Sequence, residues 1–166
     1  GLQLNRLVES LVRSAEPLAE QRGIRLTARL DPSLPLTSAD PEQIETVVRN
    51  LVSNALKFTP QGGDVSIETR LQQNRLHLSV TDTGIGIAAE DHQRIFERFE
   101  RAVDASETSG LGLGLFISLK IVGAHGGKIS VESSLGVGSN FTVRLPREAV
   151  VQTAPALRRV YEAPSP

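Results

Sequence analysis

Two hydrophobic periodicities alternate along this chain of 166 residues, and their order limits the folds that it can adopt. In some stretches apolar side chains recur every three or four residues, as on one face of a helix. In others they recur every second residue, as on one face of a strand. Each such element has an apolar face that another element must cover. The alternation therefore predicts an α/β (α+β) two-layer sandwich.

The boundaries of the expected elements follow from these periodicities and from the residues that end them. The first helix ends before Gly23, because glycine commonly follows the last turn of a helix. Asp40, Pro41 and Gln43 are typical of the cap, first residue and capping-box amide of a second helix. The predicted helices cover residues 4–22, 41–58 and 112–124, and the predicted strands cover residues 24–30, 65–71, 76–82, 128–133 and 140–145, with a hairpin turn at 72–75.

Composition excludes several classes of function. The chain has no cysteine, so it has neither disulfides nor thiolate zinc sites, which fits a reducing, cytoplasmic compartment. Lysine and arginine number 18 against 19 acidic residues, so no overall field favours nucleic acid or an anionic membrane. No apolar run reaches the roughly 20 residues that cross a bilayer, and no signal peptide is recognisable. We expect a cytoplasmic chain without direct nucleic-acid or membrane contact.

We expect one domain over residues 1–146 and a C-terminal tail over residues 147–166. Hydrophobic residues make up 39% of the chain, which is enough to build a core in a domain of this size. The tail combines prolines with little periodicity, so we expect it to be flexible. The chain begins at Gly1 rather than at a methionine, and we expect it to be part of a longer protein.

The second expected helix carries a polar stripe beside its apolar face. Gln43, Asn50, Asn54 and Lys57 recur there at helical spacing. Two amides one turn apart supply neutral oxygens for a hard cation, and Lys57 supplies an ammonium for a phosphate. The alternative is a solvated helix face. Asparagine is a poor helix former, which favours a role for the pair.

Asp82 ends a predicted strand on the same side as the apolar residues Leu76 and Val80. Its carboxylate should therefore point toward the core, where it needs a donor such as the exocyclic amine of a purine. Gly84 and Gly86 would let the backbone approach a flat ring closely. The alternative is an aspartate that caps an ordinary turn.

A basic and aromatic segment precedes the polar stretch at residues 102–109, which has no periodicity. Such a stretch is a candidate lid over a ligand, anchored by Phe96 and Phe99. The alternative is a surface helix whose phenylalanines pack inward and whose charges are solvated. The side chains that could contact a terminal phosphate are those of Arg94, Arg98 and Arg101.

Glycines alternate at Gly110, Gly112 and Gly114, just before the third predicted helix. They leave backbone N–H groups uncovered, and a helix N-terminus attracts anions, so the run indicates a phosphate site. The alternative is an ordinary loop. No strand precedes the run and no Gly-Lys-Ser/Thr closes it, so it fits neither a Rossmann fingerprint nor a Walker loop.

Taken in order, these motifs resemble the conserved boxes of sensor histidine kinases over about residues 1–146. The matching segments are an N box (Asn50, Asn54, Lys57), a G1 box (Asp82, Gly84, Gly86), an F box (Phe96, Phe99), a G2 box (Gly110, Gly112, Gly114) and a last glycine box at residues 136–142. The resemblance implies the Bergerat ATP-binding fold of the gyrase, chaperone, histidine kinase and mismatch-repair superfamily. In that fold a mixed sheet of about five strands is backed by three helices and an ATP lid.

The resemblance also implies roles for individual residues. Asn54 would ligate Mg²⁺, Asp82 would accept a hydrogen bond from adenine, and Asn50, Lys57 and Arg101 would act on the phosphates during catalysis. The residues implied to bind ATP are Asn50, Asn54, Lys57, Asp82, Gly84, Gly86, Ile87, Arg101, Gly110, Leu111, Gly112, Leu113, Gly114, Leu115 and Thr142.

Asn50 separates a kinase from a hydrolase. The ATPases of this superfamily resemble this helix but carry a glutamate at that place, where it can activate water, and an amide is no general base. We therefore expect transfer of the γ-phosphate of Mg-ATP to a protein histidine. Thr46 departs from the family, because many such kinases have Gln or Glu there, and transfer could be weaker or differently arranged. The alternatives are a water-splitting ATPase of the same fold and a nucleotide-sensing module without transfer.

The phosphoacceptor is missing from these residues. In the family it is a histidine on a helical dimerisation hairpin, and this sequence contains no such hairpin. His77, His92 and His125 read as structural or solvated, with His125 expected to be a helix-terminal cation. The implied partners are a histidine-containing phosphoacceptor domain and a downstream response regulator. We expect the isolated chain to be a monomer that binds ATP without autophosphorylation.

Overall fold

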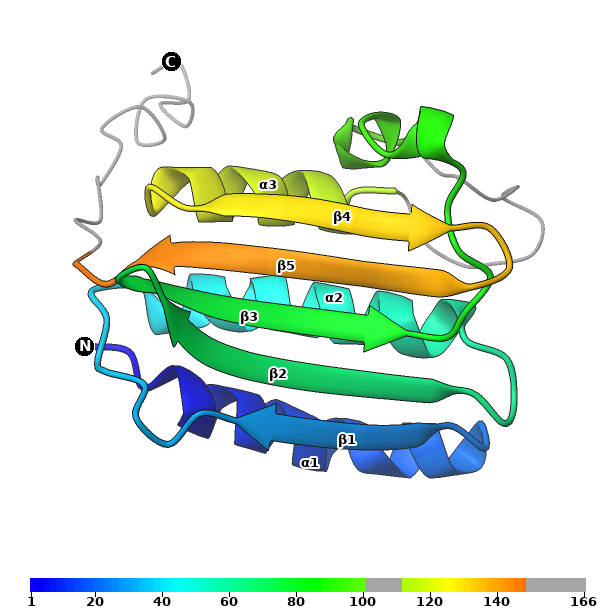
Figure 1. Cartoon of the computed structure of the whole chain (residues 1–166), viewed down its shortest axis with the longest axis horizontal. Helices are drawn as coiled ribbons and strands as arrows, with labels where there is room; N and C mark the ends of the chain where they lie inside the picture. The colour runs from blue at the N-terminus through cyan, green and yellow to red at the C-terminus, as the bar shows by residue number, and fades with distance from the viewer. Residues whose placement is uncertain (101–111, 149–166) are drawn as a thin grey trace, which may run out of the picture.

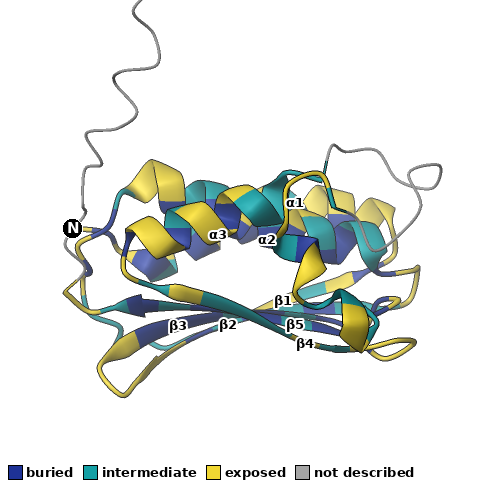
Figure 2. Ribbon diagram, turned by 90° about the horizontal axis from the view of Figure 1, so that it is seen from above, coloured by how far each residue is buried: buried dark blue, intermediate teal, exposed yellow. Residues whose placement is uncertain are grey.

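Residues 1–100 and 112–148 are described by the computed structural model, and they form two layers. One layer is a five-stranded sheet, and the other consists of three helices that cover one face of the sheet (Figure 1). The view from above shows that none of the described helices covers the second face of the sheet (Figure 2). This arrangement confirms the predicted α/β sandwich.

The sheet is mixed, as the resemblance implied. Its strand order is β1-β2-β3-β5-β4, in which β1 runs parallel to β2 and every other neighbouring pair is antiparallel. The elements are α1 (Leu4–Gln21), β1 (Arg25–Leu30), α2 (Pro41–Phe58), β2 (Asp64–Gln72), β3 (Arg75–Asp82), the short 3-10 helices η1 (Ala89–Asp91) and η2 (Arg94–Phe96), α3 (Gly114–Ala124), β4 (Lys128–Ser134) and β5 (Gly138–Pro146).

The core lies between the helices and the covered face of the sheet. Alternate residues of β2, β3 and β5 point toward the helices, and α2 presents a continuous apolar face to them. The apolar residues recur with the period of a strand in the sheet and with the period of a helix in α2. The buried side chains of this contact include Val47, Leu51, Ile67, Leu78, Val80 and Val143. Because α2 is packed along its length, its polar stripe is held in a fixed position beside the core.

The start of α2 corrects the predicted capping box. The Asp40 carboxylate accepts hydrogen bonds from the backbone N–H groups of Glu42 and Gln43, at 3.0 and 3.2 Å, as expected of an N-cap. The Gln43 side chain, however, donates to that carboxylate at 3.2 Å, and does not accept from the Asp40 backbone. The Asp40 N–H instead donates to Nε2 of His125, at 3.1 Å.

That bond also corrects the expectation for His125. Because Nε2 accepts from Asp40, the proton of the ring must be on Nδ1, which donates to the Ile121 carbonyl at 2.8 Å. His125 is almost fully buried. It is therefore a neutral link between the end of α3 and the start of α2, and the predicted helix-terminal cation is wrong.

Two local predictions concern turns. The hairpin between β2 and β3 is confirmed, and its two turn residues, Gln73 and Asn74, both have positive φ, as in the two-residue turns that match strand twist. The third helix begins at Gly114 rather than Gly112, because Gly112 has a φ of +67° and is not helical. Among the described residues, no helix combines the length and apolar character that a membrane crossing requires.

Candidate functional site

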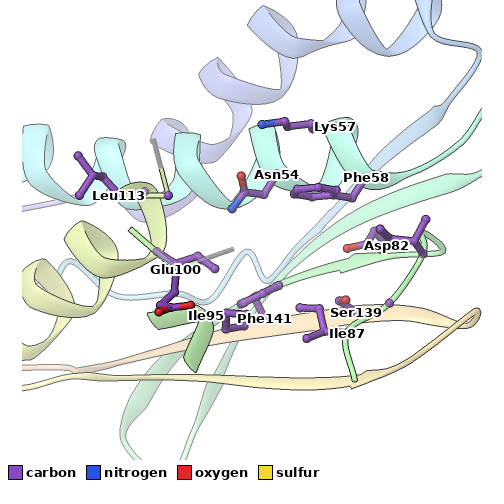
Figure 3. Close-up of a pocket in the computed structure, with 16 residues that line it drawn as sticks. Asn54, Lys57, Phe58, Asp82, Ile87, Ile95, Glu100, Leu113, Ser139 and Phe141 are labelled. Carbon is purple, nitrogen blue, oxygen red and sulfur yellow. The ribbon is translucent and has the colours of Figure 1, made fainter. Parts of the chain in front are cut away.

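A pocket of about 360 Å³ opens between α2, the ends of β3 and β5, and the segments on either side of residues 101–111. Figure 3 shows Asp82 and Glu100 at opposite ends of it, with α2 along one wall and Phe141 of β5 along the other. It is lined by Asn54, Ala55, Lys57, Phe58, Asp82, Ile85, Gly86, Ile87, Ile95, Glu100, Gly112, Leu113, Gly114, Leu115, Ser139 and Phe141. Most of this lining is apolar, with a few polar groups, as in sites for flat organic ligands.

Asp82 points into the pocket from the end of β3, as its strand parity predicts. Only 8% of the residue is exposed. Its Oδ1 accepts a hydrogen bond from the Gly84 N–H at 2.8 Å. Burial raises the pKa of this carboxyl above its ordinary value, and backbone hydrogen bonds from Gly84 and Ser139 partly offset the rise. A buried carboxylate of this kind favours a ligand that brings a hydrogen-bond donor.

Gly84 and Gly86 are needed by the protein's own backbone. A Cβ on Gly84 would lie 2.5 Å from the Phe58 carbonyl oxygen, and a Cβ on Gly86 would overlap the carbonyl oxygen of Ser134. Gly86 also has a φ of +71°, which other residues rarely adopt. These glycines let the segment after β3 pack against α2 and β4, and this packing fixes one end of the pocket.

The polar stripe of α2 divides into two parts. Asn54 and Lys57 line the pocket, and the Asn54 amide makes no hydrogen bond to any described residue. Asn50 lies outside the lining, and its Nδ2 donates to the Gly114 carbonyl at 3.1 Å and to Ser118 Oγ at 3.3 Å. Asn50 therefore ties α2 to the first turn of α3, whereas Asn54 is available to a ligand.

The neighbouring residues of α2 have separate surroundings. Lys57 Nζ lies 5.5 Å from the centre of the Phe58 ring, and both residues contribute to the pocket lining. Thr46 Oγ1 donates to the Glu42 carbonyl of its own helix, at 3.0 Å. The Thr46 hydroxyl is therefore bonded to the backbone of the preceding turn of α2.

The two phenylalanines before residue 101 have different roles. Phe96 packs edge-on against Phe141, with ring centres 6.2 Å apart, and anchors the segment to β5. Phe99 is 57% exposed, and its ring lies 4.8 Å from the Arg98 guanidinium. This segment forms short 3-10 turns, so the alternative of a regular surface helix with both rings inward is wrong.

A backbone hydrogen bond joins the residues that flank 101–111. The Phe99 N–H donates to the Gly112 carbonyl at 3.1 Å, and both residues have positive φ. Arg94, predicted as a phosphate contact, instead pairs with Asp91 at 2.7 Å and with Glu100 at 3.5 Å. The predicted site residues Arg101, Gly110 and Leu111 lie outside the described residues, as does the tail from residue 149.

Thr142, like Asn50 and Gly84, is a predicted site residue outside the pocket lining. Residues alternate along β5, so Phe141 and Val143 face the helices and Thr142 faces the open side of the sheet. There its hydroxyl lies 3.1 Å from Ser79 Oγ and 3.2 Å from the Asn140 side chain. Thr142 therefore lies outside this pocket, and its predicted contact with ATP stays a prediction.

Sequence reasoning missed several lining residues. Phe141 and Ser139 share the parity of Val143, and this signal in the sequence would have found them. Phe58 and Ala55 flank the polar stripe of α2 and could have been assigned with it. Glu100 reaches the pocket from an irregular segment, where no periodicity indicates direction.

The residues present are compatible with a magnesium ion only if a ligand completes its coordination. No cluster of three or more His, Cys, Asp or Glu side chains suited to a metal occurs in the described ranges. Asn54 offers one neutral oxygen at the pocket wall. Magnesium commonly takes one or two protein ligands, together with substrate phosphates and water. The pocket therefore fits an ion that arrives with phosphates.

Comparisons with known proteins agree with this geometry. Residues 39–149 match the family described as histidine kinase-, DNA gyrase B-, and HSP90-like ATPase. The chain is 38% identical over 140 residues to the histidine protein kinase DivJ of Caulobacter vibrioides, covering 84% of this chain and 24% of DivJ. It therefore spans about a quarter of the length of that relative.

Two solved structures are similar to this one. The catalytic domain of histidine kinase ThkA is 30% identical with a TM-score of 0.77, and the match covers 87% of this chain and 95% of that domain. Full-length ShkA in complex with AMPPNP is 30% identical with a TM-score of 0.79, covering 90% of this chain and 31% of ShkA. The chain belongs to the histidine kinase-, DNA gyrase B- and HSP90-like ATPase family, and within it to the histidine kinase catalytic domains.

Proposed function

We propose that this chain is the ATP-binding catalytic domain of a sensor histidine kinase, which transfers the γ-phosphate of Mg-ATP to a histidine on another domain. The phosphoacceptor domain would belong to the same longer protein or to a partner, and a response regulator would receive the phosphate next. We also propose that the domain is cytoplasmic and that it is a monomer when isolated from the rest of the protein. Family membership and the pocket between Asp82 and Gly114 support it.

The pocket residues divide the work of binding. Asp82 would accept a hydrogen bond from the exocyclic amine of adenine, while Phe58 and Phe141 supply apolar walls for the ring. Lys57 would attract the phosphates, and the backbone at the start of α3 would donate to them. Asn54 would hold Mg²⁺, which neutralises phosphate charge when bound. For Arg101 we keep the proposed contact with the γ-phosphate.

The observation that carries transfer over hydrolysis is the amide at position 50. Asn50 cannot accept a proton from water at neutral pH, and its Nδ2 is already engaged by Gly114 and Ser118 of α3. No carboxylate replaces it on the pocket wall formed by α2. The acceptor of the phosphate is then a group that another domain brings to the pocket.

Helix α3 offers a surface where that domain could approach. Its first turn borders the pocket, yet Ile117 and Leu119 are 39% and 37% exposed. Gly114 and Leu115 of this turn line the pocket, so a group that approaches the phosphates from this side passes α3. We propose that the acceptor domain packs against α3 with its histidine toward the phosphates.

The test supplies a helical domain with a phosphoacceptor histidine and labelled Mg-ATP to this chain. We expect acid-labile label on that domain, no label on the chain alone, and loss of transfer in Asn54→Ala. Thr142→Ala is the matched control, because Thr142 faces away from the pocket, and it should transfer normally. Phosphate release without an acceptor would contradict the proposal in favour of an ATPase. ATP binding without transfer would contradict it in favour of a nucleotide sensor.

A further inference from the structure

A row of basic side chains crosses the open face of the sheet. The strand registers place Arg70 beside His77, His77 beside Arg144, and Arg144 beside Lys128, on β2, β3, β5 and β4. We call these four residues the basic row. Their positions alternate with those of the buried residues that face the helices, so they belong to the opposite face, which no described helix covers (Figure 2). Neighbouring strands are about 4.8 Å apart, so the row spans about 14 Å.

The basic row has no acidic partner among the described residues. Arg70 and Lys128 form no ion pair there, and Arg144 donates only to Ser130 Oγ, at 3.0 Å. Elsewhere on the same face, by contrast, Arg25 pairs with Asp64 and Arg29 with Glu68. Like charges directly opposite one another destabilise a sheet, so this row is costly for the free domain.

His77 adds an independent sign that the row is incomplete. It is only 8% exposed, and its buried Nδ1 has no hydrogen-bond partner among residues 1–100 and 112–148. Burial and the charges of Arg144, Arg70 and Arg75 lower the pKa of the ring. The nearest carboxylate along β2, Glu68, belongs to the next row and pairs with Arg29. A buried polar atom without a partner is rare in native proteins and asks for an explanation.

We infer that the basic row is a docking site for an acidic helix of another domain or protein. A helix repeats every 5.4 Å, so carboxylates spaced one turn apart would match the spacing of the strands they cross. Charge complementarity between such a helix and the row would remove the repulsion among the cations. The site lies on the face opposite the pocket, so it is distinct from the nucleotide site.

Two other occupants fit less well. The chain's own residues 149–166 contain Arg158 and Arg159 against a single acid, Glu162, so they do not supply the missing charge. Nucleic acid is disfavoured because the open face carries no aromatic side chains on β2, β3, β4 or β5 for stacking with bases. Glu68 and Glu132 on the same face would also repel a continuous polyanion.

The test uses a helical alanine-rich peptide with one glutamate per turn, titrated against the full chain at low salt. We expect saturable binding with chemical-shift changes on the basic row. The double variant Arg70→Gln/Arg144→Gln should weaken binding at least about tenfold, a loss of about 1.4 kcal/mol. Binding should also weaken as salt rises to about 0.5 M. The glutamine version of the peptide should not bind.

Arg29→Gln is the matched control, because Arg29 lies on the same face outside the row and should leave peptide affinity within about twofold. Thermal melts and ATP titrations of every variant separate lost docking from lost folding. Equal affinity of wild type and double variant, or shifts confined to another surface, would overturn the inference. Row-dependent binding to anionic vesicles or single-stranded DNA, with none to the peptide, would overturn it too.

Discussion

The two ends of the pocket are built differently. At the strand end, the residues lie on or beside β3 and β5, where sheet hydrogen bonds and close backbone contacts fix the backbone. These residues are Asp82, Gly84, Gly86 and Ser139. At the loop end, Glu100 and residues 112–115 lie beside irregular backbone. There the two sides are joined by the bond from the Phe99 N–H to the Gly112 carbonyl.

This difference suggests a division of labour. A site for a planar ring gains affinity from rigid walls, since little conformational entropy is lost on binding. A site for a transferable phosphate must admit the substrate and release the product, which calls for a wall that moves. Substitutions at the strand end should therefore change stability and ring binding together. Those at the loop end should change phosphate interactions and leave the fold intact.

The largest expected effect is that of Gly86→Ala. A Cβ there would overlap the Ser134 carbonyl, and the φ of +71° is unfavourable for alanine, so the fold should lose about 2–4 kcal/mol of stability. Gly114→Ala is the matched change at the loop end, where a Cβ would lie 3.5 Å from the Asn50 side chain, an ordinary contact. Urea unfolding measures both. Equal losses of stability would mean that the two ends are equally constrained.

Asp82→Asn should change stability and ring binding together, in opposite directions. Asparagine keeps the acceptor for the Gly84 N–H but accepts more weakly from an adenine amine, so ATP affinity should fall about 10- to 100-fold. The free domain should become more stable at pH 7. The pKa of Asp82 is higher in the folded domain than in the unfolded chain, so the ionised carboxylate destabilises the fold above that pKa. This destabilisation disappears as the pH falls through the folded-state pKa.

Calorimetric titration with ATP and thermal melts at several pH values test this pair of effects. The gain in melting temperature of Asp82→Asn over wild type should shrink as the solution is acidified. A variant that loses stability at pH 7 would show that the carboxylate is a structural group. Unchanged ATP affinity would remove Asp82 from the ring site.

A smaller and more specific effect is expected for Asn54→Ala. The amide makes no hydrogen bond to described residues, so its removal should change stability by less than about 0.5 kcal/mol. ATP affinity should fall about tenfold with Mg²⁺ present and stay constant with the metal chelated. Asn50→Ala is the structural counterpart. It should lower stability with or without Mg²⁺, since the Gly114 carbonyl and Ser118 Oγ lose a donor.

Most of the features that depend on a regular spacing of side chains were predicted from the sequence. The helices, the strands, the inward Asp82 and the hairpin turn at 72–75 follow from side-chain periodicity and turn chemistry, whereas the mixed sheet followed only from the resemblance. Thr142 was assigned to the site by its motif without its strand parity, which places it outside the pocket. Helical spacing also grouped Asn50 with Asn54. Only the packing of α3 against α2 decides that the Asn50 amide bonds to the protein and that the Asn54 amide bonds to none of the described residues.

Other details depend on contacts between distant segments. The bond from Asp40 to His125 replaced the expected capping box, and no local pattern could have shown it, since the residues are 85 positions apart. Arg94 was predicted to bind phosphate from its charge alone, but its neighbours Asp91 and Glu100 hold it. Irregular segments have no alternation from which direction can be read, which is why the loop end was the least predictable.

The smallest expected effect, and the sharpest test of the loop end, is Glu100→Gln. Glu100 places a carboxylate in a pocket that is proposed to hold phosphates. This carboxylate forms a partly exposed ion pair with Arg94. Such pairs contribute about 0–1 kcal/mol, so stability should hardly change. Removing the charge should raise ATP affinity about two- to fivefold, less at high salt. Glu97→Gln, an exposed neighbour outside the pocket, should change neither. If Glu100→Gln instead weakened binding only when Mg²⁺ is present, the loop end would contribute a metal ligand and would not be merely a movable wall.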